Sequence, residues 1–420
     1  MQPERSADKE SDNRAGTRRY QSLHPNPFKS TAEQHNERNA LMKGFNLNLS
    51  KLRSGFDGRT FWAQARAGTI PGGNGKPAAV IVTAQPTLRS GSDVFYGLSE
   101  WRSADNGKTW EGPVHHADVL GRRRERNGIE VGICDATPRW HVATGQLLLT
   151  GHTVRYQDNK HPIVARPRET AYAAYSPAAK TWSPWDTVAM PDQPEFGNAG
   201  AGSAQRVDLQ DGSILLPIYH KTISPDPKAC FTATVMRCSF DGEQLKHLEH
   251  GNALTVAEPR GLCEPSLVHC HGRYYLTMRN DVRGYVAVSN DGMHFDAPCP
   301  WRFDDGTDLG SYNTQQHWVR HRDDLFLVYT RRGLDNDHVF RHRAPLMIAQ
   351  VDPARRVVLR ETERELIPNR GARLGNFSVC DITDDEIWVV AAEWMQPDGC
   401  EHYGSDNSIW IARMRWPALQ

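Results

Sequence analysis

Carboxylates and arginines stand at spacings that could serve one chemical task, which is to bind an acidic ligand and move protons around it. Glu264 precedes Arg279 by fifteen residues, and an apolar run with a His271-Gly272 turn separates them. This spacing predicts a β-hairpin with one residue at each end, so that both side chains meet at the same edge of a sheet. Arg343 follows 64 residues beyond Arg279. Because guanidinium groups pair with carboxylates in a planar, bidentate way, these arginines predict a site for a carboxylated ligand.

Two further groups could transfer protons at such a site. Asp93 lies in a loop ten residues before Ser103, and burial or a neighbouring charge could keep its carboxyl group protonated near neutral pH. Gln316 and His317 end a polar run before an apolar strand. An amide beside an imidazole can orient a water molecule and remove its proton. The alternatives are an aspartate that caps a turn and a structural histidine at the start of a strand.

The sequence offers no clear metal or cofactor site, and we expect neither. His338 and His342 stand four residues apart without a helical pattern or a third ligand, and the acidic turn at 304–308 favours a solvated loop over a calcium site. The eight cysteines form no Cys-x-x-Cys pair, which favours scattered free thiols in a reducing compartment. Three further polar residues could either serve a ligand-binding loop or cap strands: Asp135, His141 and His152.

A repeated turn motif indicates how these residues are positioned. Ser103–Trp110 reads Ser-x-Asp-x-Gly-x-Thr-Trp, the Asp-box pattern of the turn between the third and fourth strands of a β-propeller blade. We expect Asp105 and Asn106 to cap this turn and Gly107 to adopt a positive φ angle. Trp110 should bury its ring between neighbouring blades. Degraded copies follow at 175–182 and 238–242, a clear copy with Phe295 in the Trp position follows at 289–295, and a blade junction without a box follows at 348–352.

Short apolar runs between Gly, Pro, Asn and Asp turns predict an all-β chain. The six clearest runs are Ala78–Thr83, Gln146–Thr153, Ser213–Tyr219, Tyr274–Met278, Asp324–Tyr329 and Ile387–Ala392. The box serines Ser103, Ser176, Ser239 and Ser289 are separated by 73, 63 and 50 residues, which fits four-stranded blades with long loops. We therefore predict a six-bladed β-propeller, with seven blades as the alternative. We expect a polar lead-in over 1–45, a single propeller domain over 46–420, and its closing strand at 409–413.

The charge balance argues against some classes of partner. Lys plus Arg and Asp plus Glu each number 50, so no global field attracts nucleic acid or an acidic membrane surface. The N-terminal segment lacks the apolar region of a signal peptide, and no stretch of the sequence is apolar for long enough to span a bilayer. We therefore expect a cytoplasmic protein, or a secreted or periplasmic one if a signal was removed. The sequence leaves the oligomeric state open.

From about residue 60 to residue 415, these motifs in this order resemble the sialidase (neuraminidase) superfamily. The most specific block runs from Glu264-Pro265-Ser266-Leu267-Val268 through the His-Gly turn to Arg279 and the Asp box at 289–295. The resemblance implies that Glu264 is the central carboxylate and Asp93 the acid/base. It also implies an acidic glycan as the partner of the protein.

Three arginines hold the substrate carboxylate in sialidases, and the resemblance implies a candidate for each. Arg66 opens the segment Arg66–Pro71, which resembles the family's Arg-Ile-Pro motif with additional residues between Arg and Ile. Arg279 would be the second arginine. Arg343 fits the third, in an Arg-x-x-Leu pattern, with Arg341 as its competitor. Glu393 would be the glutamate that braces the first arginine.

One departure from the family changes the expected mechanism. Phe377 stands in the segment where the nucleophilic tyrosine is expected, and Tyr312 is the nearest spare tyrosine. Phenylalanine cannot attack a sugar. The resemblance to the tyrosine-lacking sialidases of glycoside hydrolase family 181 implies that Gln316 and His317 activate water instead. The expected enzyme is an exo-acting hydrolase that releases a terminal sialic acid, or a related 2-keto acid sugar, with inversion.

Two other functions remain open. A histidine base beside arginines would also suit a lyase or glycosidase that acts on a uronic-acid-containing glycan. A propeller that kept the arginines and lost turnover would be a non-catalytic glycan-binding protein. The presence of both Asp93 and Glu264 favours an enzyme, because binding alone requires neither.

Overall fold

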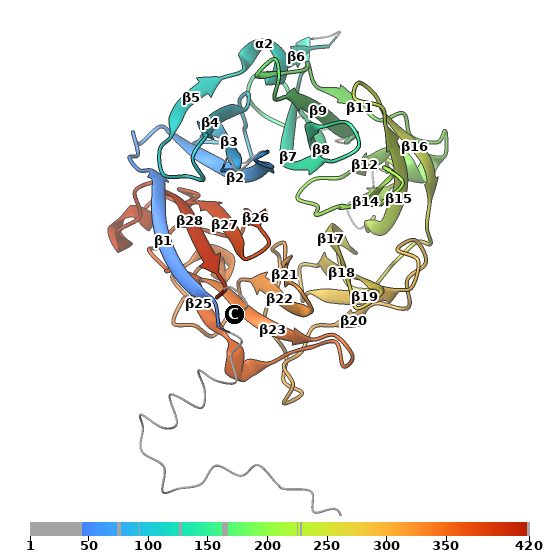
Figure 1. Cartoon of the computed structure of the whole chain (residues 1–420), viewed down its shortest axis with the longest axis vertical. Coiled ribbons are helices and arrows are strands. Elements are labelled where there is room, and N and C mark those ends of the chain that lie inside the picture. The colour runs from blue at the N-terminus through green and yellow to red at the C-terminus, as the bar shows by residue number, and fades with distance from the viewer. Residues whose placement is uncertain are drawn as a thin grey trace, which may run out of the picture. The chain divides into compact units, whose positions relative to one another are not determined.

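Six antiparallel sheets of four to six strands lie in a ring (Figure 1). The computed structural model describes residues 44–73, 77–91, 93–125, 128–161, 167–224, 226 and 229–417. The prediction of a six-bladed β-propeller is confirmed. Of the predicted lead-in, residues 1–43 lie outside the described residues, and the propeller unit begins at Phe45. Within the described part of the chain, no helix combines the length and apolar character that crossing a membrane requires.

The blades follow one another in chain order. Blade 1 contains β2 (Thr60–Ile70), β3 (Ala79–Leu88), β4 (Ser99–Ser103) and β5 (Glu111–His115). Blade 2 contains β6 (Arg123–Arg124), β7 (Glu130–His141), β8 (Gln146–Tyr156), β9 (Thr170–Ser176), β10 (Thr181–Trp182) and β11 (Asp186–Thr187). Blade 3 contains β12 (Asn198–Gly200), β13 (Val207–Asp208), β14 (Ile214–Lys221), β15 (Thr232–Phe240) and β16 (Leu245–His250).

The second half of the ring has the same plan. Blade 4 contains β17 (Cys263–Cys270), β18 (Arg273–Arg279), β19 (Tyr285–Ser289) and β20 (Cys299–Pro300). Blade 5 contains β21 (His317–His321), β22 (Asp324–Tyr329), β23 (Leu346–Asp352), β24 (Val357–Val358) and β25 (Arg364–Ile367). Blade 6 contains β26 (Phe377–Thr383), β27 (Glu386–Ala392), β28 (Ile409–Arg415) and β1 (Asn46–Arg53). The short helical segments are α2 (Ala117–Leu120), η2 (Pro194–Phe196), η3 (Phe340–His342), η4 (Arg360–Thr362) and η5 (Cys400–Tyr403).

The strands nearest the centre of the ring, called innermost strands below, are β2, β7, β12, β17, β21 and β26 (Figure 1). The apolar runs found in the sequence coincide with the strand that pairs with the innermost strand of each blade. These second strands are β3, β8, β14, β18, β22 and β27. A strand inside a sheet that is covered on both faces carries apolar residues on both faces. All seven residues of β27, for example, are buried. The sequence signal is therefore strongest for the second strand of each blade.

The ring is closed by a strand from the opposite end of the chain. β28 is the third strand of blade 6, and β1 pairs with it antiparallel from Asn46 opposite Arg415 to Arg53 opposite Ile409 (Figure 1). The predicted closing strand at 409–413 is confirmed as part of β28, and it closes the ring by pairing with β1. The sequence did not predict β1, because β1 is mostly exposed and has no apolar run that marks it as an outer strand.

The Asp box of blade 1 has the predicted place and geometry. It joins β4 to β5, and the Asp105 carboxylate accepts hydrogen bonds from the backbone N–H groups of Lys108 and Thr109. Gly107 has a φ of 73°. The second capping side chain is that of Ser103, whose Oγ accepts a bond from the Gly107 N–H. Asn106 was expected to share the capping, but its side-chain oxygen has no hydrogen-bond partner among the described residues.

Aromatic side chains from the Asp-box regions join neighbouring blades. The Trp110 ring centroid lies 6.3 Å from that of Trp388 in blade 6, which confirms the expected interblade position, although the ring is only partly buried. At the next junction, the buried Trp182 of blade 2 donates a 2.6 Å hydrogen bond from Nε1 to Glu100 of blade 1. The turns that carry these rings therefore determine how closely adjacent blades pack.

Gly107 allows a test of this packing. A Cβ atom at Gly107 would lie 2.3 Å from the Trp388 ring, whereas a Cβ atom at Gly272, which has a similar φ of 70°, would meet no atom within 4 Å. We expect Gly272→Ala to lower the free energy of unfolding by about 1–2 kcal/mol, because an alanine resists positive φ. Gly107→Ala should cost about 1–3 kcal/mol more, since the Trp388 ring must move. Chemical denaturation measures both, and equal losses would contradict the packing role.

Candidate active site

Three innermost strands carry a β-bulge at the same end of the ring. The ladder registers shift between Ala63 and Arg66, between Cys134 and Thr137, and between Cys263 and Ser266. Within these bulges Gln64, Asp135 and Glu264 have φ angles of 54°, 51° and 45°. A bulge turns a side chain away from the alternation of its strand. In blades 1, 2 and 4 it directs a polar side chain into one shared cavity.

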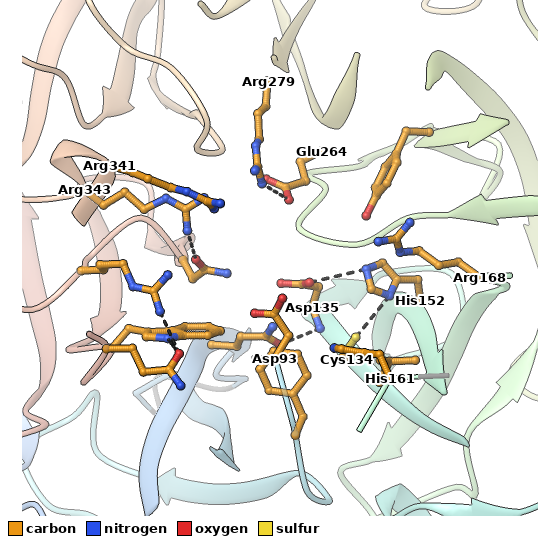
Figure 2. Close-up of a pocket in the computed structure, with 18 of the residues that line it drawn as sticks. Asp93, Cys134, Asp135, His152, His161, Arg168, Glu264, Arg279, Arg341 and Arg343 are labelled. Carbon is orange, nitrogen blue, oxygen red and sulfur yellow. Dashed lines mark hydrogen bonds and ion pairs between the residues drawn. The ribbon is translucent and has the colours of Figure 1, made fainter. Parts of the chain in front are cut away.

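This cavity has a volume of about 440 Å³ and is rich in charge (Figure 2). β17 begins and β18 ends at the cavity, so the Asp-box turns lie at the other end of the blades. Its acidic lining residues are Asp93, Asp135 and Glu264. Its arginines are Arg155, Arg168, Arg260, Arg279, Arg341, Arg343 and Arg373.

Glu264 and Arg279 meet at the predicted edge of blade 4. Arg279 stands opposite Cys263 in the β17–β18 ladder, and its Nη1 donates a 2.5 Å hydrogen bond to Glu264 Oε1 (Figure 2). The predicted hairpin geometry is therefore confirmed. Burial raises the pKa of Glu264, but Arg279 outweighs this and holds the pKa below its ordinary value. Glu264 is thus a carboxylate at neutral pH.

Three arginines on the side of blades 5 and 6 have no carboxylate within ion-pair distance among the described residues: Arg341, Arg343 and Arg373. Arg343 instead donates to the Asn313 carbonyl and to Asn376 Oδ1 at 3.4 Å, and Arg373 donates to Gln396 Oε1 at 3.0 Å. Burial, then Arg279 and Arg373, lower the pKa of Arg343 well below its ordinary value. Burial lowers the pKa of Arg373 to about 10. An anion placed among these guanidinium groups would relieve both the burial and the repulsion.

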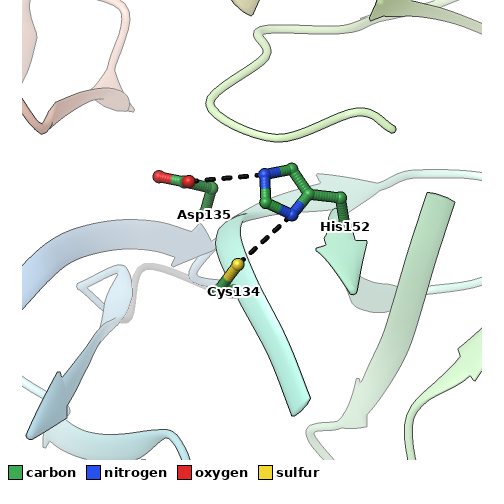
Figure 3. A group of neighbouring side chains, drawn as sticks. All are labelled: Cys134, Asp135 and His152. Carbon is green, nitrogen blue, oxygen red and sulfur yellow. Dashed lines mark hydrogen bonds and ion pairs between the residues drawn. The ribbon is translucent and has the colours of Figure 1, made fainter. Parts of the chain in front are cut away.

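Opposite this wall, His152 links a thiol to a carboxylate (Figure 3). Its Nδ1 lies 3.2 Å from Cys134 Sγ, and its Nε2 lies 3.5 Å from Asp135 Oδ2. The position of the imidazole depends on two glycines, because a Cβ atom at Gly200 or Gly202 would lie within 2.6 Å of the histidine side chain. Burial raises the pKa of Asp135, but the bond to His152, the charge of Arg66 and the bond to Ser203 together hold it well below its ordinary value.

Cys134, Asp135 and His152 offer ligand atoms of the kind that zinc prefers, all within 4.8 Å of one another. However, the thiol and the carboxylate contact different nitrogens of His152, and a metal would bind only one of them. Asp135 also accepts a 2.9 Å bond from Ser203 and pairs with Arg66 at 3.5 Å. The arrangement is that of a hydrogen-bonded relay rather than of a preformed metal centre.

Of the predicted site residues, Asp93, Glu264, Arg279 and Arg343 line the cavity together. Arg66 is not among the described lining residues; it is fully buried behind the lining residue Asp135, with which it pairs at 3.5 Å. Its guanidinium donates to the Phe377 carbonyl, to Ser203 Oγ at 2.8 Å and to Gln315 Oε1 at 3.2 Å. Its bulged neighbour Gln64 lines the cavity instead. Nor does Glu393 brace Arg66, since it accepts a 3.0 Å bond from Arg370.

The predicted water-activating pair also lies outside the set of described residues that line the cavity. Gln316 donates to Ser311 Oγ at 2.9 Å and accepts a bond of the same length from Thr277. The His317 Nδ1 lies 2.7 Å from Ser266 Oγ, and the ring packs edge-on against Phe377 at 5.0 Å. Burial, then Arg66, lower the pKa of His317 well below its ordinary value. Both side chains are 1% exposed.

Several cavity residues had no role in the sequence interpretation. Arg373, Arg168 and Tyr219 come from segments without a recognisable motif, and Tyr219 ends an apolar run that indicates only a buried strand. Asp135 and His152 were noted as polar residues without a definite role. Tyr312, the spare tyrosine, lies 2.6 Å from His342 Nδ1 and is not among the described lining residues.

Comparison with known proteins places the chain in a family. A BNR repeat-like domain model matches residues 141–364, which is more than half of the chain, so the protein belongs to the BNR repeat-like domain family. No curated protein shows significant sequence similarity to it.

Solved structures share the fold at low identity. A Dyadobacter fermentans protein of unknown function has 13% identity and a TM-score of 0.56, over 88% of this chain and 99% of the other. Trypanosoma rangeli sialidase has 12% identity and a TM-score of 0.56, over 88% of this chain and 59% of the other. The phage phi92 endosialidase has 11% identity and a TM-score of 0.53, over 90% of this chain and 70% of the other. This chain thus spans about three-fifths of the trypanosomal protein, and the likeness shows the fold alone.

The lowered pKa of Asp135 predicts an acid-dependent loss of stability. Because its folded-state pKa is depressed, the carboxylate adds stability that is present above the unfolded pKa and is lost as the pH falls through the folded pKa. Between about pH 5.5 and about pH 3, the wild-type protein should lose more unfolding free energy than Asp135→Asn. Urea denaturation across this range measures both slopes, and parallel curves would contradict the assignment.

Proposed function

We propose that the protein is a glycoside hydrolase that removes a terminal acidic sugar, of the sialic acid class, from a glycan. The observation that carries this proposal is the presence, in one cavity, of three carboxyl groups and of three arginines on the side of blades 5 and 6 that have no carboxylate partner among the described residues. Cleavage of a glycosidic bond requires an acid and a second carboxylate, and the ligand carboxylate requires cations. The relation of the fold to sialidases supports the choice of sugar.

In this proposal Arg343 and Arg373 bind the sugar carboxylate, assisted by Arg341. Asp93 donates a proton to the leaving oxygen. Glu264, held ionised by Arg279, stabilises the positive charge that develops on the sugar ring. Asp135 is a second ionised carboxylate at the cavity. Arg66 is a positioning residue, because it bonds to Asp135 and Ser203 from beneath.

Water is the nucleophile in this proposal, and the product is inverted. Phe377 offers no hydroxyl group, and the burial of Gln316 and His317 favours an ionised cavity carboxylate, Glu264 or Asp135, as the base. The mechanism retains the water attack that the resemblance to tyrosine-lacking sialidases implies.

Proton NMR of a sialyllactose digest, followed from the first minute, tests the activity and the stereochemistry together. We expect the β-anomer to be released first, because water attacks an α-linked sugar from the opposite face. Initial release of the α-anomer would contradict inversion and direct attention to Tyr219, a tyrosine that lines the cavity. No release from any sialoside would contradict the proposed hydrolase.

Arg373→Gln tests the arginine wall. The substitution should lower kcat/KM for sialyllactose about 10- to 100-fold, because one charge-assisted contact to the carboxylate is lost. Arg237→Gln, an arginine of β15 that is about one-third exposed and lies outside the lining set, is the matched control. Equal activity of the two variants would remove Arg373 from the site.

One observation favours a second candidate function, a lyase that acts on a uronate. Tyr219 and His152 both line the cavity, with ring centroids 6.2 Å apart. Burial raises the pKa of Tyr219 well above its ordinary value, so the hydroxyl stays protonated. In a lyase, this hydroxyl would be the general acid and His152 the general base. An unsaturated, ultraviolet-absorbing product from a uronate-containing glycan would support the lyase, and its absence would contradict it.

A further inference from the structure

The cavity wall formed by blades 2 and 3 carries a cation that the proposed mechanism does not use. Arg168 lies just before β9 and lines the cavity. Its guanidinium lies over two aromatic rings of blade 3, 5.6 Å from the centroid of Tyr219 and 5.4 Å from that of Phe231. No carboxylate among the described residues lies within ion-pair distance of it. Among the described residues, the Arg168 side chain donates no hydrogen bond, so its N–H groups are available for a planar anion.

Other cations surround Arg168. Lys221 Nζ lies over the same Phe231 ring at 4.6 Å, and burial, followed by Arg168, lowers the pKa of Lys221. Arg260 lines the cavity nearby and pairs with Asp281 at 3.5 Å. These three cations therefore have one carboxylate partner, Asp281, within ion-pair distance in the described structure. The local excess of positive charge is a binding determinant for an anion.

This cationic wall is separate from the arginines assigned to the sugar carboxylate. Arg341 and Arg343 precede β23 of blade 5, which stands across the six-membered ring from blade 2. Figure 2 shows Arg168 and the Arg341–Arg343 pair on opposite sides of the cavity, with Glu264 and Asp135 between them.

We propose that Arg168 forms a second anion subsite, so that the preferred ligand is an acidic glycan with two anionic groups. The inference rests on the proposed function, in which the first anion is the carboxylate of the terminal sugar. The second anion is a carboxylate or a sulfate ester on the same or the adjacent sugar. Both groups pair with a guanidinium through two parallel hydrogen bonds.

Titration calorimetry of the full chain with Asp93→Asn, which should slow turnover, tests the subsite. The ligands are 3′-sialyllactose, an α2,8-linked disialyl glycan, and a sulfated sialyllactose. We expect at least one doubly anionic ligand to bind about tenfold more tightly than sialyllactose at low salt, with the preference shrinking at high salt. Adding Arg168→Gln should bring the ratio of dissociation constants close to one. Adding Arg155→Gln should keep the preference, because Arg155 already pairs with Glu125 and Glu169.

Each outcome has a distinct meaning. A preference for the disialyl glycan identifies the second anion as a carboxylate, and a preference for the sulfated ligand identifies it as a sulfate ester. Equal binding of all three ligands, or a preference that survives Arg168→Gln, would overturn the second subsite and leave the proposed function standing. If no acidic glycan binds the protein with or without Asp93→Asn, the proposed function itself fails.

Discussion

The buried guanidinium of Arg66 joins five of the six blades at the centre of the ring. It extends from β2 of blade 1 to Asp135 of blade 2, Ser203 of blade 3, Gln315 before β21 of blade 5, and the Phe377 carbonyl of blade 6. A charge with no exposure to solvent is tolerated only when hydrogen bonds and a counter-ion replace its lost hydration. These partners come together only when the ring is closed, so the site above Arg66 depends on closure by β1.

Above this network, the cavity is organised by an uneven distribution of charge. The carboxylates Glu264 and Asp135 each have a cationic partner, which keeps them ionised. Arg343 and Arg373 have no carboxylate partner among the described residues, and their pKa values are lowered because they are buried among like charges. In a site of low dielectric constant, such groups attract an anion far more strongly than exposed arginines do. The fold therefore holds the cations in place before a ligand arrives.

Part of this arrangement can be predicted from the sequence, and the reason is local. The hairpin that joins Glu264 to Arg279 follows from its turn and its apolar runs, and the Asp boxes reveal the blade repeat. Arg66 shows the limit. The bulge between Ala63 and Arg66 places Gln64 at the cavity and Arg66 beneath it, and a change of one residue in register exchanges the faces of a strand. No residue pattern in β2 predicts that bulge. Arg373 and Arg168 were missed because only tertiary structure brings their loops to the cavity.

The bulges also explain why the site tolerates strained backbone. A non-glycine residue at positive φ costs about 1–2 kcal/mol, and Gln64, Asp135 and Glu264 each adopt this conformation. The strands remain paired on either side of each bulge, and the free energy of this pairing offsets the cost of the strained residue. The β-bulges in blades 1, 2 and 4 place the amide of Gln64 and the carboxylates of Asp135 and Glu264 in one cavity. A change of side chain at a bulge would thus alter the chemistry of the cavity while the blade repeat that builds it stays intact.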